Sequence, residues 1–257
     1  MSDKKRNLKE VLVNHFDRQD KDSFKNFGSS SFTKSWQEPY KFLENYLRKK
    51  NLHNKSFLDY CCGTGVHSIF PAKLGAKVTG TDFSPASINI AKKRANFFHV
   101  ERECNFILQD AKDIKALKDK FDFAICIQSL LYLDLDDTFE RLSKLLKENG
   151  ELIIIESVSG NFLFDLNRKR NAKKISSIFS NSLNKYSSLE IIDTSKKYFD
   201  ISKEEYFGLT TSLSYILEKK LKITFLTKIF IFFDLLLKKI PFFRKFFFTT
   251  LIILRKN

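Results

Sequence analysis

The residues with the greatest chemical potential lie in one short stretch, LDYCCGTG, at positions 58–65. It places an acid, Asp59, and a cysteine pair directly before two glycines, Gly63 and Gly65. Glycines let the backbone approach a ligand closely and adopt positive φ angles. The apolar residues before them predict a strand and the residues after them a helix. We therefore expect a strand-to-helix turn, which is where ligands bind at the carboxyl edge of a parallel sheet.

Spacing separates the ligands that such a turn can hold. A P-loop requires G-x-x-x-x-G-K-[ST], and no lysine follows Gly65 at the required place. The nicotinamide fingerprint G-x-G-x-x-G lacks its third glycine, because Ser68 stands there. Adjacent cysteines rarely converge on one metal ion, and the C-x-x-C spacing of zinc and redox sites is absent. Cys61 and Cys62 therefore predict no metal site; they are typical of small apolar residues packed in a turn.

Two further acids occupy comparable places downstream. Asp82 ends the next predicted strand in VTGTDFS, 17 residues after Gly65, near the spacing at which an acid meets a ribose diol. Asp110 ends the following strand in NFILQDAKD. Carboxylates form charge-assisted hydrogen bonds with hydroxyl and amino groups, whereas they repel a pyrophosphate. The pattern favours S-adenosylmethionine, which carries an ammonium, a ribose and an adenine amino group, over a dinucleotide.

Alternating strands and helices must position these residues. Between residues 56 and 157, the apolar runs SFLDY, KVTGTDF, NFILQD, FDFAICIQ and ELIIIES alternate with helical stretches such as SPASINIAKKRA and DDTFERLSKLLKENG. This alternation predicts a parallel sheet covered by helices on both faces. Ser84 before Pro85 predicts one helix start, and Asp136 predicts the cap of a second helix that ends before Gly150.

The stretches LDYCCGTG, VTGTDFSPASINIAKKRA, FILQDAKDI and FDFAICIQSLLYLDLDDTFERLSKLLKENGELIIIES, in this order, resemble the class I S-adenosylmethionine-dependent methyltransferases. The resemblance covers roughly residues 56–157. It implies a Rossmann-like α/β fold with a doubly wound, seven-stranded, mainly parallel sheet whose last strand is antiparallel. We expect an N-terminal helical cap over 1–55, a cofactor-binding core over 56–157, and a substrate-side region with the final strands of the same domain over 158–257.

The resemblance also implies roles in the first loop. Gly63 and Gly65 would shape the loop beneath the methionine part of the cofactor. Asp59 would orient that loop or the cofactor's amino group. Cys61 stands where the family usually has glycine, and a small side chain can fit there.

Further roles are implied at the next three strand ends. Asp82 would hold the ribose hydroxyls, and Phe83 would pack on the adenine. Asp110 and Ala111 would meet the adenine edge. Gln128 would lie at the mouth of the fourth strand, near the methyl group.

No catalytic residue can be assigned from the sequence, because methyl transfer depends mainly on alignment of donor and acceptor. Weak candidates for a general base are Tyr132 after the fourth strand, His67 in the first helical turn and His15 in the N-terminal segment. A lone His or Tyr is more often structural.

The predicted acceptor is a small or lipid-like molecule rather than a nucleic acid. Enzymes that methylate exocyclic base amines carry [NDS]-P-P-[YF] after the fourth strand, and this chain has CIQS there. A cytosine C5 enzyme would resemble the Pro-Cys nucleophile pattern, but Cys126 follows Ile125.

The net charge of +15 is uneven, since residues 160–257 hold 19 Lys and Arg against 8 Asp and Glu. Nine of the 28 phenylalanines fall between 225 and 248, in a segment that charged residues interrupt, so we expect no transmembrane span. We favour a helix buried on both sides and ended by Pro241, followed by a last strand, TTLIILRKN. The alternative is an interfacial helix that contacts an anionic membrane.

Four cysteines and the charged start MSDKKRNLKE favour a reducing, cytoplasmic location, with peripheral membrane contact as the alternative. Two other functions stay open. One is a nicotinamide-dependent oxidoreductase, which the missing third glycine disfavours, and the other is a cofactor-binding, non-catalytic adaptor.

Overall fold

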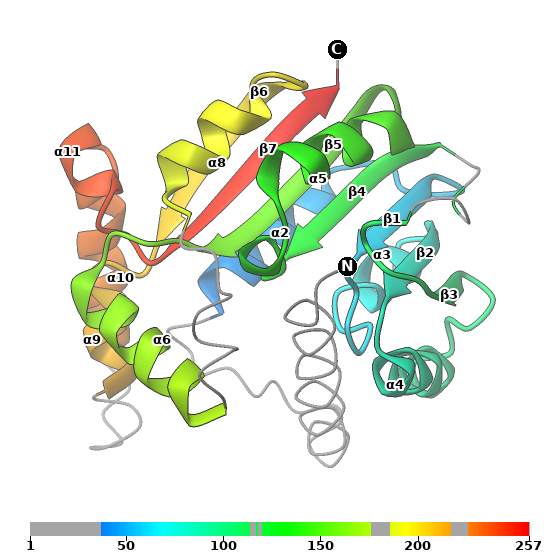
Figure 1. Ribbon diagram of the computed structural model, residues 1–257, viewed down its shortest axis with the longest axis horizontal. Coiled ribbons are helices and arrows are strands. Elements are labelled where there is room, and N and C mark those ends of the chain that lie inside the picture. The colour runs from blue at the N-terminus through cyan, green and yellow to red at the C-terminus, as the bar shows by residue number, and fades with distance from the viewer. Residues whose placement is uncertain (1–36, 114–116, 118–119, 176–185, 217–225, 257) are drawn as a thin grey trace, which may run out of the picture.

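Seven strands form one sheet, in the order β3-β2-β1-β4-β5-β7-β6 (Figure 1). The computed structural model describes residues 37–113, 117, 120–175, 186–216 and 226–256. The strands are β1 (Ser56–Tyr60), β2 (Lys77–Asp82), β3 (Cys104–Leu108), β4 (Phe121–Ile127), β5 (Leu146–Ser157), β6 (Phe199–Phe207) and β7 (Thr249–Lys256).

The sheet is parallel from β3 through β5, and β7 lies antiparallel between β5 and β6. The chain thus has the expected doubly wound fold, and its last strand is antiparallel, as predicted. All five predicted runs of the core are strands.

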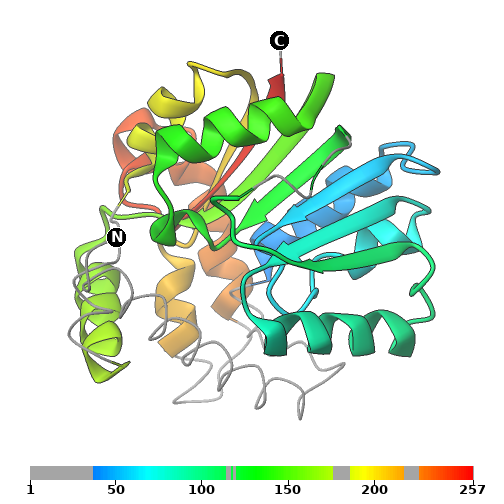
Figure 2. The ribbon, with the colours of Figure 1, turned by 45° about the vertical axis from the view of Figure 1, so that its right-hand side comes forward.

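Helices cover both faces of this sheet (Figures 1 and 2). They are α2 (Glu38–Arg48), α3 (Ile69–Lys73), α4 (Pro85–Phe97), α5 (Leu135–Leu145), α6 (Phe162–Ile175), α8 (Ser188–Ser195), α9 (Thr211–Ile216), α10 (Leu226–Leu237) and α11 (Pro241–Arg244), with a 3₁₀ turn, η2, at Leu130–Tyr132. One hydrophobic core joins α2, α3 and α4 to the sheet. A second core joins α5 and α8 to the opposite face.

Strand β5 shows why two cores form. Successive side chains of a strand point to opposite faces, so a run that is apolar at every position must be covered on both sides. Ile153 and Ile155 enter the core with α2, α3 and α4. Leu152 and Ile154 enter the core with α5 and α8.

Backbone hydrogen bonds join the loops at the carboxyl ends of neighbouring strands. The N–H of Cys62 donates to the carbonyl of Thr81 at 2.8 Å, and the N–H of Gln109 donates to that of Asp82 at 2.8 Å. The N–H of Gln128 donates to the carbonyl of Ile155, also at 2.8 Å. Because β1 also pairs with β4 in parallel, the loops after β1 through β5 lie along one edge of the sheet.

Helix α2 is attached to the sheet by a buried acid. Glu151, in β5, accepts a hydrogen bond from the Tyr46 hydroxyl at 2.8 Å and pairs with Lys50 at 2.7 Å. Residues 1–36, which include the candidate His15 and most of the predicted N-terminal cap, lie outside the described residues.

The helix ends match the predictions in part. Ser84 caps α4 as expected, accepting from the N–H of Ser87 at 3.0 Å. The prediction for α5 was wrong: its cap is Asp134, because α5 begins at Leu135, and Asp136 lies in the first turn and pairs with Lys197.

The C-terminal prediction also needs correction. Helix α10 ends at Leu237, and Pro241 begins the short helix α11 rather than ending α10. Proline suits a first helical position because its fixed φ is preorganised and no N–H is required there.

Candidate active site

The loop after β1 is built from left-handed backbone. Cys61, Gly63 and Gly65 have φ angles of +61°, +50° and +70°. Cys61 therefore adopts the conformation that glycine provides most easily, at the position where the resemblance implied a glycine.

The two glycines have different functions. A Cβ atom at Gly63 would meet nothing within 4 Å, so this residue faces open space. At Gly65 it would lie 2.9 Å from the Cβ of Ala91 and 3.1 Å from the Phe106 ring. Gly63 therefore leaves room for a ligand, and Gly65 lets the loop pack closely against α4 and β3.

Asp82, the last residue of β2, holds this loop in place. Its Oδ2 accepts a hydrogen bond from the Gly63 N–H at 2.9 Å, and its Oδ1 accepts one from the Ser84 N–H at 2.9 Å. The side chain is 7% exposed. A carboxylate can accept up to about four hydrogen bonds, so this type of side chain suits hydroxyl groups as well as backbone N–H groups.

Asp59 lies deeper, at the end of β1, and is 2% exposed. Its Oδ2 accepts a hydrogen bond from the Ser68 hydroxyl at 2.6 Å. Burial raises the pKa of Asp59 to about 7, the Ser68 hydrogen bond opposes the shift, and the charge of Asp82 adds to it. The serine at the position of the missing third glycine thus binds the strand-end acid.

The third acid, Asp110, lies just beyond β3. Its Oδ1 accepts a hydrogen bond from the N–H of Lys112 at 3.1 Å. The neighbouring Ala111 carbonyl accepts a hydrogen bond from the Tyr60 hydroxyl, and the adenine candidate Phe83 is half-buried at the turn after β2.

The three strand-end acids meet around Cys61. Burial first, and then the charges of Asp82, Asp59 and Asp110, raise the pKa of the Cys61 thiol well above its usual value. The structure thereby brings together the acids that the sequence placed at three successive strand ends.

Arg94 is a site residue that the sequence reasoning missed. From α4, its Nε donates to the Thr64 carbonyl at 2.9 Å, and its Nη2 lies 3.5 Å from the Thr64 hydroxyl. It is buried, like its helical neighbours Ala91 and Ala95. An arginine on the apolar stripe of a predicted helix was the available signal.

Gln128 follows β4 directly and also has left-handed backbone, with φ of +54°. Its Oε1 accepts a hydrogen bond from the Ser157 hydroxyl at 2.7 Å. Tyr40 of α2 hydrogen-bonds to the Gln128 side chain and stacks on His67, with ring centroids 5.0 Å apart. Tyr40 was also missed by the sequence reasoning.

Glu156, near the end of β5, is an acid that the sequence reasoning also missed, and it is 1% exposed. Its two oxygens accept the N–H groups of Leu130 at 2.8 Å and of Ser157 at 3.0 Å. Burial raises the pKa of Glu156 to about 7, although these hydrogen bonds and the Arg168 charge oppose the shift. Glu156 thus holds the turn that carries Tyr132.

The base candidates have unfavourable pKa shifts for that role. Burial and the charge of Arg94 lower the pKa of His67 to about 4, so its imidazole is neutral at pH 7. Burial and the charge of Glu156 raise the pKa of Tyr132 above its usual value, so its phenol stays protonated. His15 lies outside the described residues.

The site can hold a cationic nucleoside but shows no metal centre. A carboxylate at each of three strand ends, beside a glycine with open space, suits hydroxyl and amino groups. Within the described residues, no three His, Cys, Asp or Glu side chains are grouped so that they could hold a metal ion. The fold and the site together define a Rossmann-like α/β protein with a nucleoside-binding edge.

The family follows from comparison with known proteins. A family model described as "Methyltransferase domain" matches residues 51–211, which is more than half of the chain. The chain belongs to this methyltransferase family, and the resemblance drawn from its motifs is confirmed.

Curated relatives match over part of their length. A mitochondrial ubiquinone biosynthesis O-methyltransferase of Schizosaccharomyces pombe is 32% identical over 116 residues, which are 44% of this chain and 42% of that protein. A putative methyltransferase of Bacillus subtilis is 33% identical over 118 residues, which are 44% of this chain and 45% of that protein. The chain thus spans less than half the length of these two relatives.

Solved structures agree in fold over more of the chain. Magnesium protoporphyrin IX methyltransferase from Synechocystis PCC 6803, solved with bound SAH, gives a TM-score of 0.65 at 17% identity and covers 97% of this chain and 100% of that one. Geranyl diphosphate C-methyltransferase from Streptomyces coelicolor gives 0.61 at 16% identity, covering 90% and 86%. These likenesses establish the fold.

The left-handed backbone at Cys61 generates a stability prediction. A protein with glycine in a folded segment is normally less stable than the same protein with alanine there, but this order reverses at a position where φ is positive. We expect the free energy of unfolding of Cys61→Gly to exceed that of Cys61→Ala by about 1 kcal/mol, measured by urea denaturation. The matched control is buried Cys126 in β4, where the alanine variant should be the more stable. The same order at both positions would contradict the assignment.

The raised pKa of Asp59 predicts a pH dependence of stability. A carboxyl that titrates near pH 7 when folded and near pH 4 when unfolded binds more protons in the folded state between these values. Stability is therefore lost as the pH rises through this range, and Asp59→Asn abolishes that loss. We expect Asp59→Asn to gain roughly 2–3 kcal/mol relative to the parent between pH 5 and pH 8, measured by urea denaturation.

The control is Asp122→Asn at the opposite edge of the sheet. A hydrogen bond with Lys147 and two with Ser56 outweigh burial and lower the pKa of Asp122 to about 2. The contribution of the ionised Asp122 to stability is therefore complete above pH 5. The free energy of unfolding of Asp122→Asn should differ from that of the parent by a constant amount between pH 5 and pH 8. A constant difference for Asp59→Asn as well would refute the Asp59 assignment.

Proposed function

We propose that this protein is an S-adenosylmethionine-dependent methyltransferase that acts on a small, hydrophobic or anionic acceptor. The observation that carries the proposal is the bridge made by Asp82 between the glycine loop and the β2 turn, beside open space at Gly63. Asp59 and Asp110 add two acids at the neighbouring strand ends. When bound, S-adenosylmethionine supplies an electrophilic methyl group on a sulfonium.

The chain's own residues provide binding and orientation. Asp82 would accept hydrogen bonds from the ribose hydroxyls, and Gly63 leaves the space that the ligand requires. Asp59, ionised, favours a cationic ligand. Alignment of donor and acceptor is the protein's main contribution, and it supplies roughly 7–11 kcal/mol in well-oriented systems.

The same residues argue against a nicotinamide dinucleotide. A pyrophosphate needs backbone N–H donors at a helix N-terminus and no nearby anions. Here the Gly63 N–H donates to Asp82, and Asp59 lies behind the loop. Ser68, in place of the third glycine, is buried and donates to Asp59.

The acceptor side consists of Tyr40, His67, Gln128 and Tyr132 around the ends of β4 and β5. Burial chiefly, with the charge of Glu156, raises the pKa of Tyr40 to about 12, so both phenols keep their protons at pH 7. His67 is neutral. We propose that these groups orient the acceptor by hydrogen bonding and stacking, and that Glu156 positions the turn after β4.

The names of the relatives support a lipid-like acceptor. They include an O-methyltransferase of ubiquinone biosynthesis, a sterol 4-C-methyltransferase of Caenorhabditis elegans and geranyl diphosphate C-methyltransferase. These compounds are small and largely apolar. We propose that α2 and the described parts of the region 158–246 enclose such an acceptor over the core of 56–157.

The test is incubation of the protein with a cell extract and isotopically labelled S-adenosylmethionine, followed by mass spectrometry of the labelled products. A labelled small molecule that forms only with the protein supports the proposal. Calorimetric binding of the methyl donor without any labelled product would indicate a non-catalytic adaptor. Binding of a nicotinamide dinucleotide instead would indicate an oxidoreductase.

Asp82 provides the sharpest prediction for the donor site. Asp82→Ala removes the acceptor of two backbone N–H groups and of the ribose hydroxyls, so we expect the dissociation constant for S-adenosylmethionine to rise by roughly tenfold or more, measured by calorimetry. Asp82→Asn should lose most of this affinity too, because its NH₂ group faces one of the two N–H donors.

Asp122→Asn is the matched control for binding, because Asp122 lies at the amino edge of β4, where it pairs with Lys147. Its affinity for the donor should equal that of the parent. An Asp82→Ala variant that is folded by circular dichroism and binds with parental affinity would disprove the role of Asp82.

A further inference from the structure

Helix α10 turns a polar side toward the protein. Its two buried residues are Thr227 and Asp234. The Asp234 carboxylate accepts hydrogen bonds from the Thr210 N–H at 2.6 Å, the Thr210 hydroxyl at 2.6 Å and the Thr211 hydroxyl at 2.7 Å. The Gly208 N–H donates to it at 3.2 Å. Asp234 therefore fixes α10 to the start of α9, beside which it lies (Figures 1 and 2).

The opposite side of α10 and the start of α11 are apolar and exposed. Seven of the thirteen exposed large hydrophobic residues in the described part of the chain lie here, with exposed fractions of 44–62%. They are Ile229, Phe232, Phe233, Leu235, Leu236, Ile240 and Phe242. We call this set, together with the exposed Lys228, Lys239 and Lys245, the α10–α11 surface. The expectation of a helix buried on both sides was wrong.

This arrangement is the reverse of an ordinary surface helix, whose apolar stripe faces the core. Four of the residues, Ile229, Phe232, Phe233 and Leu236, follow the spacing of one helical face. A contiguous exposed apolar face is typical of a surface that contacts a membrane or another protein. The hydrogen bonds of Asp234 make the orientation specific. Turning the helix over would bury the leucines and phenylalanines, but it would remove the Asp234 carboxylate from its hydrogen-bond donors.

The distribution of charged residues favours a membrane over another protein as the partner. Residues 226–245 contain five Lys and Arg and one acid, and that acid, Asp234, is turned inward. Lys228, Lys239 and Lys245 are exposed, and the Lys245 ammonium lies over the Phe242 and Phe246 rings at 4.7 and 5.0 Å from their centroids. An apolar face edged by cations alone matches a bilayer with anionic headgroups.

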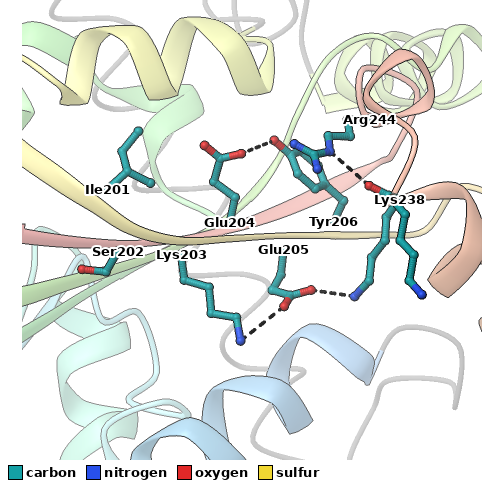
Figure 3. Close-up of a pocket in the computed structure, with 9 residues that line it drawn as sticks. Ile201, Ser202, Lys203, Glu204, Glu205, Tyr206, Lys238 and Arg244 are labelled. Atoms are coloured by element: carbon teal, nitrogen blue, oxygen red, sulfur yellow. Dashed lines mark hydrogen bonds and ion pairs between the residues drawn. The ribbon is translucent and has the colours of Figure 1, made fainter.

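Edge strand β6 holds the C-terminal end of α10 in place (Figure 3). Beside it lies a pocket of about 420 Å³. There the Lys238 ammonium pairs with Glu205 at 2.6 Å, and Lys203 pairs with the same carboxylate at 3.4 Å. Arg244 donates to the Lys238 carbonyl at 3.0 Å. Lys238 is thus committed to the protein, whereas the exposed lysines of the α10–α11 surface are available to a partner.

We propose that the α10–α11 surface lies on an anionic membrane, parallel to its plane. Helix α10 has 12 residues, about 18 Å of helix, against a hydrocarbon core of about 30 Å. No helix within the described residues is long and apolar enough to cross a bilayer. Contact is therefore peripheral. The proposal is independent of the methyltransferase activity and is tested without a methyl donor.

The test is co-sedimentation of the full chain with vesicles of phosphatidylcholine and phosphatidylglycerol, compared with phosphatidylcholine alone. We expect binding to the anionic vesicles, weakened by added salt. Phe232→Ser with Leu236→Ser should weaken it by roughly tenfold or more. Lys239→Gln alone, which removes one exposed charge and no apolar contact, should weaken it by about fivefold.

The matched controls are Phe97→Ser and Lys92→Gln on α4, two residues that are also exposed and lie outside the α10–α11 surface. Both should bind vesicles like the parent. The proposal is overturned if the parent binds neither kind of vesicle, or binds both kinds equally, or if the variants on α10 and α4 behave alike. Concentration-dependent dimerisation that Phe232→Ser abolishes, without vesicle binding, would also overturn it and assign the surface to a second copy of the chain.

Discussion

The candidate site depends on one carboxylate that accepts hydrogen bonds from two backbone segments. Asp82 joins the Gly63 N–H, in a loop with left-handed residues, to the Ser84 N–H, at the start of α4. Without it, the Gly63 and Ser84 N–H groups would lose their acceptor, which costs on the order of 1–3 kcal/mol for a buried donor such as the Ser84 N–H. A carboxylate also suits the hydroxyl groups of a ribose, so we propose that the group that builds the loop binds the ligand as well. Structure and recognition therefore share the same atoms.

The topology makes this convergence possible. In the order β3-β2-β1-β4-β5, strand β1 is central. The chain adds β2 and β3 on one side of β1 and then crosses over to add β4 and β5 on the other side, so the loops after β1, β2 and β4 meet at one edge. Ligands bind at such switch points in open α/β sheets. Antiparallel β7 then fills the place beside β5, and its register brings the carboxyl ends of β5 and β6 to the same edge, so α9, which follows β6, begins at that edge. One sheet thus supports the candidate site and the α10–α11 surface.

Local patterns predicted most of the core, and remote contacts explain what they missed. LDYCCGTG, Asp82 and Ser84 could be read from the sequence because a strand, its turn and its helix are consecutive there. Glu156 and Arg94 could not, since an acid or an arginine in a strand or helix shows its role only through partners 26 and 30 residues away. A helix in the Phe-rich segment that forms α10 was predicted from the sequence. Its orientation was not, because it is set by Asp234 and its distant partner Thr210.

The position of Cys61 has a further chemical consequence. A thiolate beside a sulfonium is a competent nucleophile, and an enzyme that held one there would alkylate itself. The carboxylates around Cys61, which suit the cation, also stabilise the neutral S–H form, since their charges and its burial raise the pKa of the thiol. Attraction for the reagent and protection from it thus arise from the same three anions. The loop can keep a sulfur atom beside the proposed cation site because that sulfur stays protonated and unreactive.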